Sequence, residues 1–147
     1  MAIDASGAML ALAREAMRSR RPRVRLICAR LPQLPFADRG FDAAISNSLL
    51  HHLPDPAVLW HDVARLVRPG GAVHVMDLFR PGSVDEARAI VEAAAGDEDS
   101  ILKDDFFNSL LAAFTPQEVR GQLEASGLGH LDCAVVSERH VLVSGCR

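Results

Sequence analysis

Two adjacent histidines, His51 and His52, are the side chains of this sequence best suited to chemistry near neutral pH. Histidine exchanges protons between pH 5 and 8, and its neutral ring is a common metal ligand. Neighbouring residues of a regular element point in different directions, however, so the pair is not expected to share one metal ion. Three cysteines, Cys28, Cys133 and Cys146, are far apart and form no CxxC pair. The sequence therefore predicts no metal site, and it predicts the reduced thiols of a cytoplasmic protein.

The composition is that of an ordinary globular protein. The chain has 147 residues, of which 49% are hydrophobic and 24% charged, and its formal net charge is -3. A negative balance argues against a nucleic-acid partner. The apolar runs are too short to cross a bilayer, so no membrane partner is expected. The local basic stretch RSRRPRVR, residues 18–25, is interpreted as a solvated loop.

Strand-like and helix-like segments alternate along the chain. Three short apolar runs, at residues 23–29, 41–48 and 72–78, have the length of buried strands. Helices are expected from Ser6 to about Arg18 and after four further start signals, at Asp55-Pro56, Ser83, Ile101 and Thr115. The tail, residues 131–145, predicts an antiparallel hairpin. This order predicts an α/β fold with a mostly parallel sheet and helices on both faces.

Ligands of such sheets lie beyond the carboxyl ends of the strands. The residues expected at these ends are Asp4, Ala29 to Leu31, Ser46 to Ser48, and Asp77. Asp4 by itself is more typical of a helix N-cap than of a ligand contact. The two histidines follow directly after one of the strand ends, so we expect them in the same region.

Two long motifs then indicate a family. Residues 34–56 read LPFADRGFDAAISNSLLHHLPDP, and residues 63–77 read VARLVRPGGAVHVMD. In this order and spacing they resemble the class I S-adenosylmethionine-dependent methyltransferases of type 11. The resemblance implies a Rossmann-like fold with residues 1–147 as one N-terminally truncated domain. It also implies S-adenosyl-L-methionine as cofactor, a small-molecule methyl acceptor, and a helical insert at residues 83–114 on the substrate side.

The resemblance also implies roles for single residues of the cofactor site. Asp4 would accept hydrogen bonds from the ribose hydroxyls, and a carboxylate is able to accept both. Ser46 and Asn47 would line the methionine end of the cofactor. Arg30 and Leu31 stand where relatives bind adenine with an acid and a backbone N–H. Here the sequence departs from the family, because arginine has no acceptor.

For catalysis, the resemblance implies that a histidine of the pair, His51 or His52, and Asp77 form a general base for an oxygen acceptor. A neutral imidazole oriented by a carboxylate is able to remove a hydroxyl proton near pH 7. The alternative is that one histidine caps the loop and the other faces solvent. Nitrogen and carbon acceptors stay open.

The sequence contains no GxGxG loop. We expect the first strand of the family and its glycine-rich loop to precede Met1, and we expect this chain alone to be inactive or nearly so. Two inner strand edges would then have no partner and would favour self-association. Two rival interpretations are a nicotinamide dehydrogenase, which the lack of tyrosine disfavours, and a non-catalytic remnant or partner subunit acting as an interaction module.

Overall fold

The computed structural model describes residues 1–18, 23–32 and 34–147. Residues 19–22 of the basic stretch therefore lie outside the described residues, and the loop expected there stays a prediction. The chain divides into two compact units, residues 1–35 and 36–147. Each unit is described by itself below.

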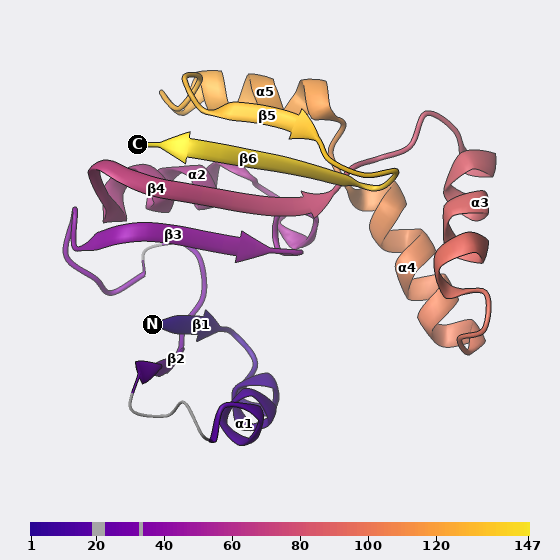
Figure 1. The fold of residues 1–147 in the computed structure, drawn as a ribbon, viewed down its shortest axis with the longest axis horizontal. Coiled ribbons are helices and arrows are strands. Elements are labelled where there is room, and N and C mark those ends of the chain that lie inside the picture. The colour runs from indigo at the N-terminus through magenta and orange to yellow at the C-terminus, as the bar shows by residue number, and fades with distance from the viewer. Residues whose placement is uncertain (19–22, 33) are drawn as a thin grey trace. The chain divides into compact units, whose positions relative to one another are not determined.

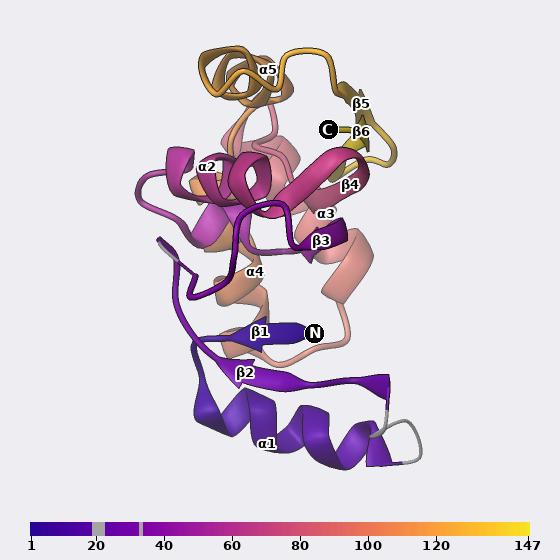
Figure 2. The same cartoon turned by 90° about the vertical axis from the view of Figure 1, so that its left-hand side faces the viewer.

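The first unit consists of two short parallel strands and one helix (Figure 2). Strand β1 (Ala2–Asp4) pairs with β2 (Leu26–Cys28), and Ile3 stands opposite Ile27. Between them runs α1 (Gly7–Ala16), whose Leu10 is buried. Ser6 caps this helix as predicted, because its side chain accepts the N–H of Met9. The helix ends two residues before the predicted Arg18, and the second strand is shorter than predicted.

The second unit is built on a four-stranded sheet with the order β3-β4-β6-β5 (Figure 1). Strands β3 (Phe41–Asn47) and β4 (Val67–Leu78) are parallel. Strands β5 (Asp132–Val135) and β6 (His140–Cys146) form the predicted antiparallel hairpin, and β6 pairs with β4. These findings confirm the α/β fold class.

Two helices, α2 (Ala57–Leu66) and α5 (Pro116–Ala125), lie behind the sheet in Figure 1. Trp60 of α2 is completely buried, and its Nε1 donates to Oε1 of Gln122 on α5 at 3.0 Å. Thr115, the predicted start signal, caps α5 and forms a capping box with Glu118. The covered face of the sheet carries an alternating set of buried valines, Val73, Val75, Val141 and Val143.

The Pro69-Gly70-Gly71 segment differs from the sequence interpretation. The sequence predicts the strand at residues 72–78, but β4 begins at Val67, directly after α2. The turn is absorbed as an irregularity in the pairing with β3, and Gly70 has a φ of 75°. A Cβ on Gly71 would lie 2.6 Å from Cγ1 of Val67 and 2.8 Å from the carbonyl oxygen of Asp42. Only glycine therefore lets the two strands approach here.

The segment at residues 83–114 forms two helices, α3 (Val84–Ala95) and α4 (Ser100–Ala112). They enclose a small apolar core of buried residues, Ala87, Ile90, Val91 and Leu110. Phe106 and Phe107 pack against it and are partly buried. That this hairpin forms the substrate side stays a prediction. No helix of the described residues is long and apolar enough to cross a membrane.

Candidate active site

Asp77 is the centre of the candidate site. It is the second-last residue of β4, and only 1% of it is exposed. Its Oδ2 accepts the backbone N–H groups of Leu49 at 2.7 Å and Leu50 at 2.6 Å. These N–H groups begin the short 3-10 helix η2 (Leu50–His52), which follows β3. The carboxylate therefore fastens the loop after one strand to the end of the next.

His51 makes the third contact with this carboxylate. Its Nδ1 lies 2.5 Å from Oδ1 of Asp77, which also accepts the backbone N–H of Leu78 at 2.8 Å. Both side chains are buried, with 4% of His51 and 1% of Asp77 exposed. Because a carboxylate only accepts, we assign the proton of this contact to Nδ1. A neutral His51 then carries its lone pair on Nε2, which is the atom that a general base requires.

His52 has a different environment from its neighbour, since the residue is exposed. Its ring centroid nevertheless lies 4.0 Å from that of His51, with the planes tilted by 43°. The expectation that the two rings point apart is therefore wrong, because the rings lie in contact with each other. Burial lowers the pKa of His52 below 6.5, the charge of His51 lowers it further, and Asp77 opposes both effects.

Ser46 and Asn47, the predicted contacts of the methionine end, lie at the carboxyl end of β3. The Oγ of Ser46 is buried and has no hydrogen-bond partner among the residues that the structure describes. Buried polar groups are rarely left unpaired, so this hydroxyl is suited to a ligand. Asn47 is exposed, and its Nδ2 donates to Oγ of Ser48 at 3.3 Å.

In the first unit, Asp4 and the segment at Arg30 and Leu31 lie at the same end of the β1-β2 pair. The backbone N–H of Ala29 donates to the carbonyl of Asp4 at 3.1 Å. The Oδ1 of Asp4 accepts the N–H of Ser6 at 2.7 Å, while Ser6 itself caps α1. Asp4 is thus not the cap of the helix, and its carboxylate is exposed. Arg30 is exposed as well, and Leu31 is half-buried.

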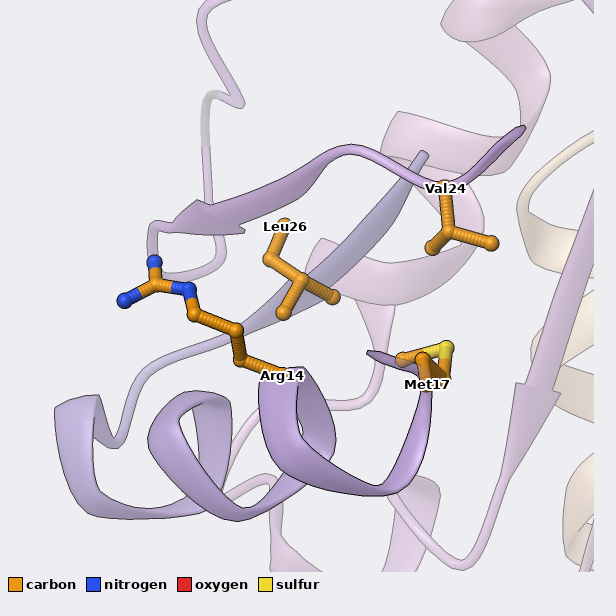
Figure 3. Close-up of a pocket in the computed structure, with 4 residues that line it drawn as sticks. All are labelled: Arg14, Met17, Val24 and Leu26. Atoms are coloured by element: carbon orange, nitrogen blue, oxygen red, sulfur yellow. The ribbon is translucent and has the colours of Figure 1, made fainter. Parts of the chain in front are cut away.

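A hollow of about 260 Å³ lies between α1 and β2 and is lined by Arg14, Met17, Val24 and Leu26 (Figure 3). Val24 and Leu26 stand at the amino end of β2, whereas ligands of parallel sheets bind beyond the carboxyl ends. Asp4 stands at that other end. We therefore do not assign this hollow to the site.

Two further groups, neither of them predicted from the sequence, lie at the site in the second unit. The first is the pair of backbone N–H groups at Leu49 and Leu50, which carry no signal in a sequence. The second is His140 at the start of β6, which pairs with Leu78 beside Asp77. Burial and the charge of Arg139 lower the pKa of His140, and the charge of Asp77 opposes them. Only the register between β6 and β4 places His140 beside Asp77, and this register is a feature of the tertiary structure.

Residues 1–75, just over half of the chain, match a family model described as a methyltransferase domain. The methyltransferase GfsG of Streptomyces halstedii is 35% identical over 86 residues, which cover 56% of this chain and 31% of GfsG. The chain belongs to this family, the class I S-adenosylmethionine-dependent methyltransferases.

Solved structures agree with the fold. A SAM-dependent methyltransferase from Aquifex aeolicus matches 97% of this chain and 65% of its own with a TM-score of 0.66 at 16% identity. The cyclase SpnF matches 99% of this chain and 64% of its own with a TM-score of 0.56 at 17% identity. The chain spans about a quarter to a third of the length of the curated relatives that it matches.

The described residues are compatible with S-adenosyl-L-methionine, the cofactor of this family. Ser46 offers a buried hydroxyl without a partner, and Asp4 offers an exposed carboxylate at a strand end. Leu31 offers a backbone N–H, whereas Arg30 has no acceptor for an amino group. Within the first unit, the residues therefore offer an acceptor for the ribose hydroxyls but no side-chain acceptor for the adenine amino group.

Proposed function

We propose that this chain carries the catalytic residues of a methyltransferase that acts on a hydroxyl group of a small molecule. The contact between His51 and Asp77 is the observation that supports this proposal. An oxygen acceptor requires a base near pH 7, whereas a free amine or a stabilised carbanion has a weaker requirement. A buried imidazole with Nδ1 on a carboxylate is suited to that task.

In this mechanism, Nε2 of His51 removes the hydroxyl proton of the acceptor. Asp77 keeps the imidazole in the tautomer with a free Nε2 and stabilises the imidazolium that forms. S-adenosyl-L-methionine supplies the methyl group as an electrophile when it is bound. Asp4, Leu31, Ser46 and Asn47 would hold the cofactor, and the α3-α4 hairpin would border the acceptor. Arg30, where relatives carry an acid, would lie beside the adenine.

His52 is proposed as the second histidine of the site, with the supporting role of excluding water from His51. The two rings are in contact, and the lowered pKa of His52 keeps it mostly neutral at pH 7. A neutral His52 does not repel the positive charge that His51 gains on protonation, whereas a charged His52 would. We propose the cytoplasm as the compartment, in keeping with the reduced thiols.

The first experiment is a calorimetric titration of S-adenosylhomocysteine into the purified chain, with circular dichroism to show that the chain is folded. Micromolar binding that is weakened by Ser46→Ala and by Asp4→Ala supports the proposed cofactor site. A folded chain that shows no binding contradicts it for this chain. Because the sequence has no GxGxG loop, we expect any methyl transfer by the chain alone to be slow.

The catalytic assignment needs a separate test with a panel of phenolic and alcoholic acceptors. His51→Gln and Asp77→Asn should lower methyl transfer by about 10²–10⁴-fold, the usual contribution of a general base. His52→Gln, the matched control next to it, should cost far less. Equal losses in the two histidine variants would contradict the assignment of His51 as the base.

A second candidate function is a non-catalytic interaction module. Arg30 supports it because it removes an adenine contact of the family. Under this alternative the chain co-purifies with an active methyltransferase and transfers no methyl group itself. Restoration of cofactor binding by Arg30→Asp would favour a weakened enzyme over a module.

A further inference from the structure

The turn between β5 and β6 lies at the end of the sheet where β3 and β4 end (Figure 1). His140, the first residue of β6, stands opposite Leu78, the residue after Asp77. The backbone N–H of Phe79 donates to the carbonyl of Arg139 at 3.0 Å, which holds the turn against the end of β4. Ligands of sheets of this kind bind at this end. His140 therefore belongs to the region of the candidate site.

The hydroxyl of Ser137 orients the ring of His140. Its Oγ accepts the backbone N–H groups of Arg139 at 3.3 Å and of His140 at 3.1 Å. The same Oγ lies 2.9 Å from Nδ1 of His140. A hydroxyl has two acceptor lone pairs and one proton, so these two N–H donors leave only the proton for the third contact. Ser137 therefore donates to Nδ1, and a neutral His140 carries its own proton on Nε2.

His51 and His140 consequently have opposite tautomers. Nδ1 of His51 donates to Asp77, which leaves its Nε2 as an acceptor. Nε2 of a neutral His140 is a donor. Burial and the charge of Arg139 lower the pKa of His140, and the opposing charge of Asp77 does not cancel them, so the ring is mostly neutral at pH 7. This end of the sheet therefore holds one imidazole acceptor and one imidazole donor.

Helix α4 contacts both of the segments that carry these histidines. The guanidinium of Arg139 lies over the ring of Phe106, with Cζ 5.9 Å from the ring centroid. The same helix contacts η2, which carries His51. The α3-α4 hairpin, the proposed border of the methyl acceptor, is thus packed against the turn as well as against the base.

We propose that His140 donates a hydrogen bond from Nε2 to a second oxygen of the methyl acceptor, next to the hydroxyl that His51 deprotonates. The acceptor is then a hydroxy compound that carries a further oxygen, such as a carbonyl. An analogue of the same shape without that oxygen leaves the donor unpaired and binds less tightly. Ser137 is the positioning residue of this donor. The inference rests on the proposed function, because it takes His51 as the base.

NMR titrations of the purified chain with two sets of small phenols test the inference. The three isomeric hydroxyacetophenones carry a carbonyl, and the three ethylphenols have nearly the same shape without it. We expect at least one hydroxyacetophenone to bind about fivefold to tenfold more tightly than the matching ethylphenol. This ratio is in the range of one neutral hydrogen bond.

Variants then assign the preference to His140. His140→Phe should abolish it, whereas His140→Asn should keep part of it, because the amide retains an N–H donor. Ser137→Ala should reduce the preference, and Ser137→Thr, which retains the hydroxyl, should not. The matched control is His130→Phe. Nε2 of His130 lies 3.1 Å from the carbonyl of Cys146, at the opposite end of β6, so this variant should leave the preference unchanged.

The absence of any carbonyl preference in the unaltered chain overturns the inference. So does a preference that survives in His140→Phe, or one that is lost equally in His130→Phe. Circular dichroism of each variant shows that it remains folded.

The titrations need neither cofactor nor turnover, so they separate this inference from the proposed function. A preference that depends on His140, in a chain without methyl transfer that depends on His51, supports the donor role and overturns the proposed function alone. Methyl transfer that depends on His51, without an effect of His140 on binding, overturns the donor role alone.

Discussion

His51 and Asp77 are 26 positions apart in the sequence, yet Nδ1 of the histidine lies 2.5 Å from Oδ1 of the aspartate. The parallel pairing of β3 and β4 produces this contact, because it places the loop after β3 next to the end of β4. The same carboxylate accepts three backbone N–H groups. Asp77 therefore orients the proposed base, and it also holds the loop after β3 through hydrogen bonds to its backbone.

The structural role predicts a difference between two substitutions of Asp77. Asp77→Ala leaves buried N–H donors without an acceptor, and we expect a loss of about 2–5 kcal/mol in the free energy of unfolding. Asp77→Asn retains one oxygen for the N–H groups of Leu49 and Leu50, so its loss should be smaller. Urea unfolding of both variants measures the difference. Equal losses would show that the carboxylate does not hold the loop as described.

The titration of His52 is a second prediction. Its ring should titrate below pH 6.5 in a proton NMR experiment, because burial and His51 disfavour its charged form. Removing the neighbouring charge with His51→Gln should raise the pKa of His52. Removing the carboxylate with Asp77→Asn should lower it, since Asp77 favours the charged form. Shifts of the opposite sign would contradict the arrangement of the three groups.

The pH dependence of stability follows from two histidines. The pKa values of His52 and His140 are lowered in the folded chain, so the unfolded chain binds more protons as the pH falls through 6.5. The contribution of these two histidines to the free energy of unfolding is therefore complete above pH 6.5. It is lost as the pH falls from 6.5 through their lowered pKa values in the folded chain. Replacing both residues by glutamine should flatten the curve of unfolding free energy between pH 7 and 5. If the slope of unfolding free energy against pH stays unchanged in this variant, groups other than these two histidines cause the pH dependence.

The strand approach at Gly71 gives a fourth prediction with an internal control. Gly71→Ala places a methyl group against Val67 and the backbone of Asp42, so we expect a loss of about 1–3 kcal/mol or more. Gly121→Ala lies within α5, and beyond its chain neighbours and the backbone of its own helix the new carbon has no atom within 4 Å. It should raise stability by about 0.4–1 kcal/mol. Thermal unfolding of the two variants should therefore shift in opposite directions.

The sequence by itself determined the family, the order of most elements and the helix caps. The caps at Ser6 and Thr115 are readable because they depend on residues three positions away. The motif at residues 34–56 is readable because its order and spacing are specific. The exact start of β4 was not, since the irregular pairing at Gly71 depends on Asp42 of the neighbouring strand.

Only the tertiary structure decided which histidine meets Asp77. Both histidines belong to the same motif, and the local sequence does not indicate which of them contacts the carboxylate of Asp77. The pairing of β3 with β4 and the turn of η2 place His51 against Asp77 and leave His52 exposed. The buried hydroxyl of Ser46, which has no hydrogen-bond partner among the described residues, belongs to the same category. Such features depend on which groups approach across the sheet, and no local pattern in the chain encodes that distance.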